Sequence, residues 1–511
     1  MTFPASPTDA ALEEFVSVAP AVAEELQAAG FSVDGLQNLL GADGVAAMDR
    51  GEPEAVASAA RHKRSPLSTL IDGVIIGDPA QLDEVLSPEV FSRLTELGVI
   101  APLCDGYVLT LDIRPIHLHG REVLVFSDRD ASMRPHVPQR HHVPGVGRAS
   151  WSLIDISPAG PTDSVLDLGA GCGVQAAGQL DARSIVATDI SERANSLARA
   201  TLSAAGRSDA EVLAGSWFEP VEGRQFSRIV ANPPFVVGPP SVEHVYRDSG
   251  LDLDGATETT VRGAANHLEI DGTAHILGSW AHVGDQGWEA RVASWIPEHG
   301  VEAWIVQRDV VGPAEYAGTW LRDESIDPRS HDGRERMRHW LDHFEFSDVR
   351  GVGFGYISLQ RIDGPSSVVC EELPQALGGP FHLEVSEHFA RSAWLREAEK
   401  DSILDSQYLL RPGIAVERIE LTDTEAGQGF APEALRITRT DGPRWSHDVD
   451  ESVLAVLRAI HPDAPLSFTL ELLTDFGRFG DADPDEVRES MIPVVVDLVR
   501  HGFLIPTDIL D

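Results

Sequence analysis

The chain has 511 residues, of which 42% are hydrophobic, and its formal net charge is −41. The length predicts about three domains. No run of about 18 apolar residues occurs, which argues against a membrane-spanning helix. The acidity argues against a broad phosphate-binding face, because such a field repels nucleic acid at long range, although a local arginine patch remains compatible with it.

Three widely spaced cysteines, Cys104, Cys172 and Cys370, provide neither a disulfide framework nor a metal-ligand spacing. The N-terminus lacks the basic start and apolar core of a secretory signal, so we expect a cytoplasmic protein. We expect no metal site. A loop-rich region is dense in histidines, which together with Arg148 are candidates for the substrate entrance. These are His117, His119, His136, His141 and His142.

Residues 1–150 form the first predicted domain. Apolar residues at helical spacing predict helices over 11–29, 66–76 and 88–97. Two segments have the composition of strands, 106–111 and 122–126. Helices that end in a hairpin predict a winged-helix-like module that recognises the substrate.

Residues 151–363 alternate strands with helices, which predicts a parallel sheet in an α/β, Rossmann-like domain. A helix over 190–205 follows the second strand. The seven expected strands cover 164–168, 184–188, 210–214, 228–231, 273–277, 301–306 and 352–360.

Residues 364–511 form the third predicted domain, after a linker at 363–367. Helices are expected over 446–460 and 485–501, and Pro493 predicts a kink or a break in the second of them. A short strand begins at Gly502. This pattern predicts another small helical, winged-helix-like module.

A glycine-rich turn follows the strand at 164–168 and reads Gly169-Ala170-Gly171-Cys172-Gly173. The glycines permit a positive φ and a close approach of backbone to a ligand that carries a carboxylate and a sugar. Cys172 is interpreted as a small space-filling residue. The turn precedes a predicted helical segment over 175–180, which is the context that a nucleotide-like cofactor requires.

Asp189 ends the apolar run 185–189 of the second strand, about twenty residues beyond the turn. A carboxylate at this position can accept hydrogen bonds from both ribose hydroxyls, as in dinucleotide-binding folds. A dinucleotide oxidoreductase is therefore the rival interpretation of this feature. The glycine spacing argues against an oxidoreductase. A second motif, described next, also argues against it, because its residues have no role in such an enzyme.

That motif is Asn232-Pro233-Pro234-Phe235, at the end of the strand over 228–231. The lone pair of a planar amide or exocyclic amine is delocalised, so such a nitrogen is a poor nucleophile. The Asn232 side-chain oxygen and the Pro233 carbonyl can accept its two N–H groups and direct the lone pair at a methyl donor. Phe235 can stack on the planar group, and catalysis is then mainly orientation.

In this order, the turn, Asp189 and the Asn-Pro-Pro-Phe tetrad resemble class I S-adenosylmethionine (SAM)-dependent methyltransferases, specifically the branch that methylates planar nitrogen. The resemblance implies a seven-stranded Rossmann-like domain, SAM as cofactor, and a place for Asp167 near the ammonium of SAM. Ser216 and Trp217 stand where relatives contact the adenine. The implied cofactor set is Asp167, Gly169, Ala170, Gly171, Gly173, Asp189, Ile190, Ser216, Trp217 and Asn232.

The segment 246–255 also looks like the release-factor glutamine methyltransferases, although 142–150 departs from the segment that those enzymes carry upstream. Small-subunit ribosomal RNA methyltransferases share the tetrad with phenylalanine. We therefore expect N-methylation of a protein glutamine on a translation factor or ribosomal protein. The alternative is an exocyclic amine of adenine or guanine in ribosomal RNA or DNA, and a catalytically silent binding module is a third, weaker hypothesis.

Overall fold

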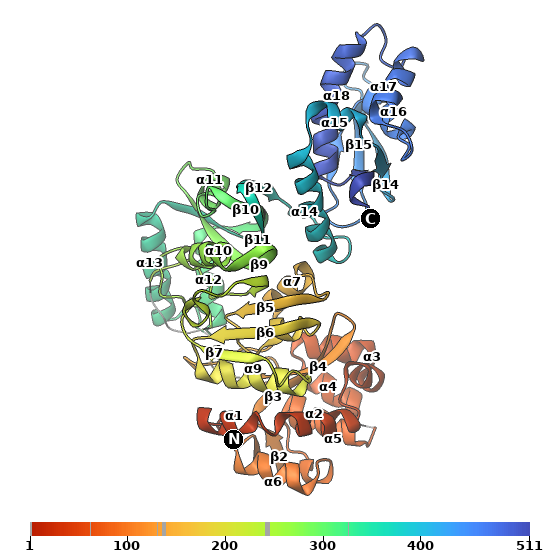
Figure 1. Ribbon diagram of the computed structural model, residues 1–511. Coiled ribbons are helices and arrows are strands. Elements are labelled where there is room, and N and C mark those ends of the chain that lie inside the picture. Colours follow the sequence, from red (N-terminus) through yellow and green to blue (C-terminus); the bar gives the residue numbers. More distant parts are fainter. Residues whose placement is uncertain are drawn as a thin grey trace. The chain divides into compact units, whose positions relative to one another are not determined.

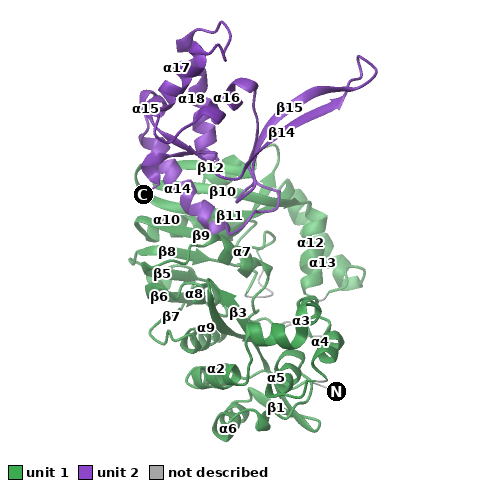
Figure 2. Ribbon diagram, turned by 90° about the vertical axis from the view of Figure 1, so that its right-hand side faces the viewer, with its two compact units in different colours: residues 1–372 green, residues 373–511 purple. Residues whose placement is uncertain are grey.

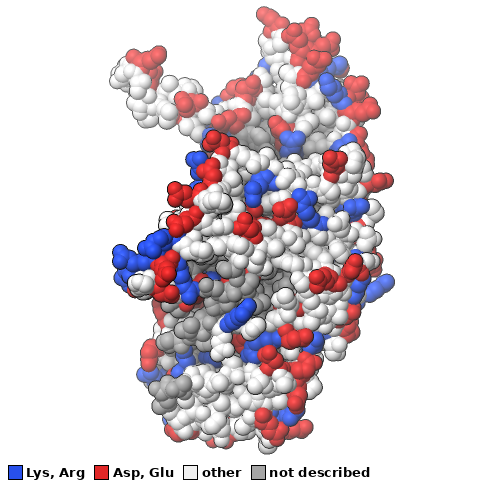
Figure 3. All heavy atoms as spheres, turned by 90° about the vertical axis from the view of Figure 1, so that its left-hand side faces the viewer, with Lys and Arg blue, Asp and Glu red and all other residues white. Residues whose placement is uncertain are grey.

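The computed structural model describes residues 3–61, 63–129, 131–134, 139–240, 246–324 and 326–510. The chain divides into two compact units, residues 1–372 and 373–511 (Figure 2). None of the helices in these ranges is both long and apolar enough to span a bilayer. On the face drawn in Figure 3, acidic and basic side chains are interspersed rather than separated into large fields.

The first unit begins with a helical region. The expected helix over 11–29 is two helices, because Pro20 lies at the start of the second, where its missing N–H is tolerated. The expected helix over 66–76 continues as a π-helical turn, Ile71–Ile76. The α-helices are α1 (Asp9–Phe15), α2 (Ala19–Ala28), α3 (Val33–Arg50), α4 (Pro53–Ala60), α5 (Pro66–Leu70) and α6 (Pro88–Glu96).

Two antiparallel hairpins follow the helices. The expected strand over 106–111 is interrupted at the buried Thr110, whose hydroxyl donates to the Gly98 carbonyl at 2.7 Å. The winged-helix character of this region stays a prediction. The hairpins pair β1 (Ile100–Leu103) with β2 (Gly106–Leu109), and β3 (Leu111–Leu118) with β4 (Arg121–Asp128).

The centre of the first unit is an eight-stranded sheet in the order β12-β10-β11-β9-β8-β5-β6-β7 (Figure 1). β5, β6, β7, β8 and β9 run parallel, and β11 lies antiparallel between β9 and β10. The domain is α/β and Rossmann-like, as predicted. The strands are β5 (Thr162–Leu168), β6 (Ala182–Asp189), β7 (Glu211–Ala214), β8 (Phe226–Ala231), β9 (Leu268–Val283), β10 (His299–Val311), β11 (Val349–Pro365) and β12 (Ser367–Glu372).

All seven predicted strands are present, and β12 is an eighth. The segment expected to be a linker, 363–367, instead contains the end of β11 and the start of β12 with only Ser366 between them, and Gly364 has a φ of 122°. β12 pairs in parallel with β10, from Ser367 opposite Glu302 onward. Its six residues are half-buried or exposed and carry no strong apolar pattern, so this long-range pairing creates a strand that local sequence does not announce.

Helices cover the sheet and link its strands. α8 is much shorter than the segment predicted over 175–180, and α9 matches the helix expected over 190–205. An insert of two helices, α12 and α13, joins β10 to its antiparallel neighbour β11. The helices are α7 (Arg148–Ile156), α8 (Val174–Ala177), α9 (Glu192–Ala204), α10 (Gly255–His267), α11 (Trp288–Ala293), α12 (Pro313–Asp323) and α13 (His331–Phe346).

The N-terminal region shares a hydrophobic core with α9, which contributes Leu197 and Ala200 to it. A buried ion pair joins the two regions, since Arg193 Nη2 lies 2.5 Å from Asp128 Oδ1 and both side chains are less than a tenth exposed. The Phe126 N–H donates to the Thr201 hydroxyl at 3.1 Å. Residues 1–150 therefore belong to the same compact unit as the sheet.

The second unit combines helices with a three-stranded antiparallel sheet. Residues 446–448, expected to begin a helix, form β16, and α16 starts only after Asp450, whose carboxylate caps the Val453 N–H at 2.8 Å. α18 passes through Pro493 without ending. The elements are α14 (Phe381–Glu397), α15 (Lys400–Asp405), β13 (Tyr408–Leu410), β14 (Ile414–Thr422), β15 (Phe430–Arg439), β16 (Ser446–Asp448), α16 (Glu451–Ala459), α17 (Leu466–Asp475), α18 (Pro484–Arg500) and β17 (Leu504–Pro506).

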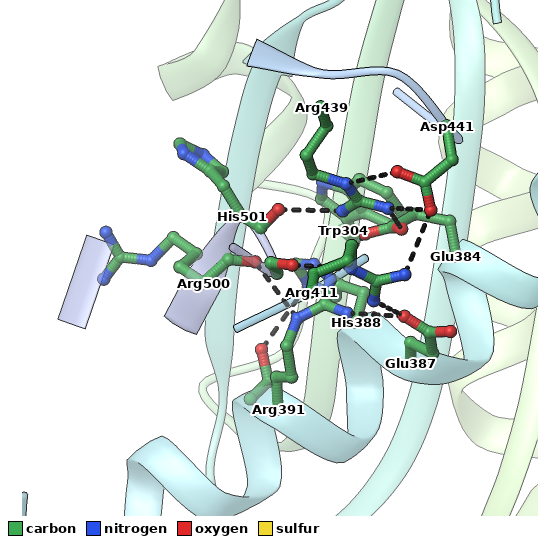
Figure 4. A network of polar contacts seen from close by, with 12 residues as sticks. Trp304, Glu384, Glu387, His388, Arg391, Arg411, Arg439, Asp441, Arg500 and His501 are labelled. Atoms are coloured by element: carbon green, nitrogen blue, oxygen red, sulfur yellow. Dashed lines mark hydrogen bonds and ion pairs between the residues drawn. The ribbon is translucent and has the colours of Figure 1, made fainter. Parts of the chain in front are cut away.

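A buried charge network links the helices and strands of the second unit (Figure 4). Glu384, 3% exposed in its side chain, pairs with Arg391 at 2.5 Å and Arg439 at 2.6 Å. Burial alone would raise the pKa of Glu384, but the two guanidinium groups lower it below its ordinary value. Arg411 adds ion pairs to Glu387 and Asp441. Because the network joins residues far apart in sequence, no local pattern predicts it.

Candidate functional site

A pocket of about 430 Å³ opens where β5, β6, β7 and β8 end. Leu168 pairs with Thr188 on one side and with Ala231 on the other, so the glycine turn, Asp189 and Asn232 follow three adjacent strands at one edge. Ligands of open α/β sheets bind at such carboxyl ends. The sheet thus brings together motifs that lie far apart in the chain.

The glycine turn forms one wall of the pocket. Gly169, Gly171 and Gly173 have φ angles of 73°, 55° and 77°. The N–H groups of Gly169 and Ala170 both donate to the Thr188 carbonyl at 2.9 Å, which fixes the turn against β6. Gly169, Ala170 and Gly171 line the pocket.

Gly173 has a different place from the other two glycines. It precedes α8, outside the pocket lining, and a Cβ on it would meet the Ala198 Cα of α9 at 2.9 Å. Cys172 is buried and lines the pocket, and burial raises the pKa of its thiol to about 12. A thiol held in this protonated state agrees with the space-filling interpretation.

Asp167 is fully buried beneath the turn and is not part of the pocket lining. Its Oδ2 accepts the Ala176 N–H at 2.9 Å, whereas its Oδ1 has no hydrogen-bond partner in the described part of the chain. Burial raises the pKa of this carboxyl to about 7. An unpartnered buried carboxylate oxygen next to a pocket fits a cationic group of a ligand, reached directly or through water.

Asp189 lines the pocket with a carboxylate that is held in place by backbone. Oδ2 accepts the Gly171 N–H at 2.9 Å and Oδ1 accepts the Ser191 N–H at 2.8 Å. Burial raises the pKa of Asp189, and these N–H groups oppose the rise. An ionised carboxylate has about four acceptor positions and the backbone does not occupy all of them, so Asp189 can still accept a ribose hydroxyl. Ile190, 62% exposed, lies at the rim.

The third cofactor segment also reaches the pocket. Ser216 and Trp217 both line it, and Trp217 adopts a φ of 49°. Gly215 permits the tight turn before them, because a Cβ there would meet the Pro220 side chain at 2.4 Å. These positions suit backbone and ring contacts to a planar group.

The tetrad borders the same pocket. Asn232, Pro233 and Pro234 line it, whereas the half-buried Phe235 lies just beyond the lining. The Ser279 hydroxyl donates to the Phe235 carbonyl, and the Val237 N–H donates to the Tyr316 hydroxyl at 2.8 Å. The backbone after the tetrad is therefore anchored to β9 and α12.

The pocket has further walls that sequence reasoning located only in part. His141 and His142 line it, as expected of an entrance, and so does Arg140, which the sequence did not single out; the His142 ring lies edge-on to that of Tyr246 at 6.0 Å. Arg148 begins α7 outside the lining. The residues that sequence reasoning missed include Val143, Pro144, Gly145, Ser150, Val174, Gln175, Ser191 and Ala194.

The other histidines of the expected cluster lie elsewhere. His117 pairs with Glu122 at 3.8 Å on the β3–β4 hairpin, and His119 lies in its turn. His136 lies outside the described residues. Over the described ranges, no group of three His, Cys, Asp or Glu side chains is arranged to hold a metal ion.

The segment 246–255 packs against the insert. Arg247, 4% exposed, pairs with Glu324 at the end of α12, and Tyr246 donates to Asp323 at 2.9 Å. Asp254 pairs with Arg291 at 2.6 Å and caps the Ala281 N–H. These contacts fix the segment beside the pocket. They join residues that are distant in sequence, so the sequence of the segment does not predict them.

Three families match parts of the chain. Residues 145–279 match the family described as Methyltransferase small domain. Residues 28–109 and 386–506 match two families described as Domain of unknown function, DUF7059 and DUF7782. The first match covers most of the pocket and the strands that build it.

Known proteins resemble the same region. Ribosomal RNA small subunit methyltransferase C of Sodalis glossinidius (strain morsitans) is 36% identical over 116 residues, which are 22% of this chain and 29% of that protein. The chain therefore spans less than a third of the length of this relative. A T. thermophilus 16S ribosomal RNA N2-methyltransferase with AdoMet and guanosine has a TM-score of 0.28 at 20% identity, covering 41% of this chain and 56% of that one. A ribosomal RNA methylase from Streptococcus thermophilus has a TM-score of 0.24 at 12% identity, covering 43% and 100%.

The sheet order, the pocket and the family match define a class I SAM-dependent methyltransferase domain in the first unit. Its cofactor is SAM, and the residues present fit this molecule. The turn leaves room for a ligand, the Asp189 carboxylate lines the pocket where it can accept from a ribose, and the buried Asp167 has an oxygen without a partner in the described part of the chain.

Proposed function

We propose that this protein transfers a methyl group from SAM to an exocyclic amine of a nucleobase in ribosomal RNA. The observation that carries the proposal is the place of Asn232–Phe235, at the border of the pocket that also contains the glycine turn and Asp189. Such a tetrad can hold a planar nitrogen close to a cofactor in this pocket.

The mechanism depends on orientation. When bound, SAM supplies a methyl group on a positively charged sulfur. The Asn232 side-chain oxygen and the Pro233 carbonyl accept the two N–H groups of the amine, which directs its lone pair toward the methyl group. The ring of Phe235 stacks on the base, and positioning of this kind can provide about 7–11 kcal/mol of a barrier. Once methylated, the nitrogen carries a positive charge and is acidic, so it releases one proton to water without a strong base.

Ribosomal RNA is preferred over the protein glutamine expected from sequence. The relative that is 36% identical over the matched residues is named for ribosomal RNA, and the matched family covers the tetrad. The preference for a protein acceptor rested on the acidity of the chain and on the segment 246–255, and the comparisons give it no support.

The test is transfer of labelled methyl from SAM into ribosomes and total RNA from cells that lack this protein. Nuclease and protease digestion of separate portions identifies the acceptor, and mass spectrometry of the nucleosides identifies the base. We expect label in one position of ribosomal RNA that survives protease and not nuclease. Label in a discrete protein band would overturn the proposal and return the glutamine hypothesis.

A further inference from the structure

A second cavity of about 340 Å³ adjoins the cofactor pocket, and Asp248 and Ser249 line both. We name it the insert pocket, because side chains of α13 form its outer wall against the segment that follows the tetrad. We propose that the insert pocket binds the nucleoside next to the methylated one in the substrate strand. This inference rests on the function proposed above and adds a specificity-determining subsite to it.

Planar side chains give the insert pocket a surface for a base. His339 and Trp340 of α13 line it, with His339 exposed and Trp340 half-buried. Trp340 lies against Gly238, where a Cβ would meet the indole at 2.9 Å, and its ring is 6.0 Å from that of Tyr316. Gly238 follows Phe235 closely in the chain, so a base on Trp340 would lie near one held by the tetrad. Stacking on aromatic side chains suits any base.

The guanidinium groups of the insert pocket are engaged with carboxylates. Glu324 pairs with both Arg247 and Arg336, and Arg336 also lies 3.3 Å from Asp332. Arg247 Nε lies 3.2 Å from Asp248 Oδ1. The lining thus contains four carboxylates and two guanidinium groups. A phosphate inside it would meet net repulsion, which favours the base and ribose as the group that enters.

Glu335 is the fourth of these carboxylates and has no ion pair among the described residues. It is exposed on α13, where its oxygens can accept N–H or O–H groups. The exocyclic amine of a base and the hydroxyls of a ribose are such donors. The aromatic side chains, the negative charge of the lining and the acceptor oxygens of Glu335 therefore all favour a nucleoside as the ligand of the insert pocket.

The experiment uses the full chain and an RNA fragment that contains the methylated position. A thio-substituted base, 4-thiouridine or 6-thioguanosine, replaces the neighbour on either side of the target, and irradiation is followed by peptide mapping. We expect one of the two neighbours to crosslink to residues 331–346. Glu335→Ala should raise KM for the fragment about tenfold and leave kcat within about twofold, because one hydrogen bond to a charged acceptor is lost and the reacting atoms are untouched.

Glu345→Ala is the matched control, since Glu345 is an exposed glutamate of the same helix outside the pocket lining. It should change neither KM nor the crosslink. If the wild-type protein methylates the fragment but neither neighbour crosslinks to this helix, or Glu335→Ala behaves as the control does, the subsite is refuted and the proposed function stands. If the wild-type protein methylates no RNA, the proposed function itself fails.

Discussion

Asp167 shows how one buried residue connects folding to the cofactor pocket. Burial raises its pKa from 3.8 to about 7. Between these values the unfolded chain has released the proton and the folded chain still binds it. Stability therefore falls as the pH rises from about 4 to about 7, and no further change from this group occurs above that range.

We therefore predict that Asp167→Asn stabilises the cofactor-free protein in a pH-dependent way. The melting temperature of the variant minus that of the wild type should increase from about pH 5 to about pH 7 and then stay level, because asparagine does not ionise. Thermal unfolding across buffers measures it. Asp163→Asn, at an exposed carboxylate of the same strand, is the control. A difference that does not vary with pH would contradict the raised pKa.

Asn232 is the residue on which the proposed chemistry depends. We predict that Asn232→Ala keeps the Kd for SAM within about threefold and lowers the transfer rate by about 100-fold or more, since a hydrogen bond that orients the acceptor is lost. Calorimetry with SAM and single-turnover transfer give the two numbers. An unchanged rate would refute the mechanism, whatever the acceptor.

At the scale of elements, the glycine turn serves both the ligand and the packing of α9. We predict that Gly173→Ala destabilises the protein by more than the roughly 1–2 kcal/mol of a left-handed residue, because its Cβ also meets Ala198. Gly206→Ala is the control, with a φ of 81° and no atom near its Cβ position. Urea unfolding compares the two variants. If the two variants lost the same free energy of unfolding, α9 would have moved to accept the new Cβ at no cost, which would contradict the prediction.

Strand and helix predictions fail where long-range contacts decide. β12 forms because β10 offers it an edge, although its sequence reads as a continuation of a linker. Residues 446–448 pair with β15 instead of extending α16. The apolar strands under the pocket are predicted well, because buried parallel strands have continuous hydrophobic runs that are visible locally.

At the scale of the whole molecule, the two compact units have separate hydrophobic cores. The core around Tyr408, Leu470 and Val499 contains only residues of the second unit, and every residue of the cofactor pocket belongs to the first. We predict that a chain ending at Glu372 folds and binds SAM with a Kd within about threefold of the full chain. Calorimetry measures it, and loss of SAM binding in a folded truncated chain would contradict the independence of the units.

The net charge of −41 has a consequence for an RNA substrate. Long-range repulsion between two polyanions is screened by salt, so we predict that KM for RNA stays constant or falls between about 50 and about 200 mM salt. Steady-state kinetics over this range measures it, with SAM affinity as the control. A steep rise of KM with salt would instead reveal a dominant set of arginine–phosphate contacts.

The sequence by itself determined the class of chemistry. Its motifs are short and local, and each lies at the end of an apolar strand, so the glycine turn, Asp189 and the tetrad are recognisable without coordinates. The tertiary structure alone decided what surrounds them. The ion pair of Arg247 with Glu324 and the insert pocket arise from side chains that meet only after folding. Contacts between residues that are distant in sequence produce no local sequence pattern. For this reason only the tertiary structure shows the substrate side of the site.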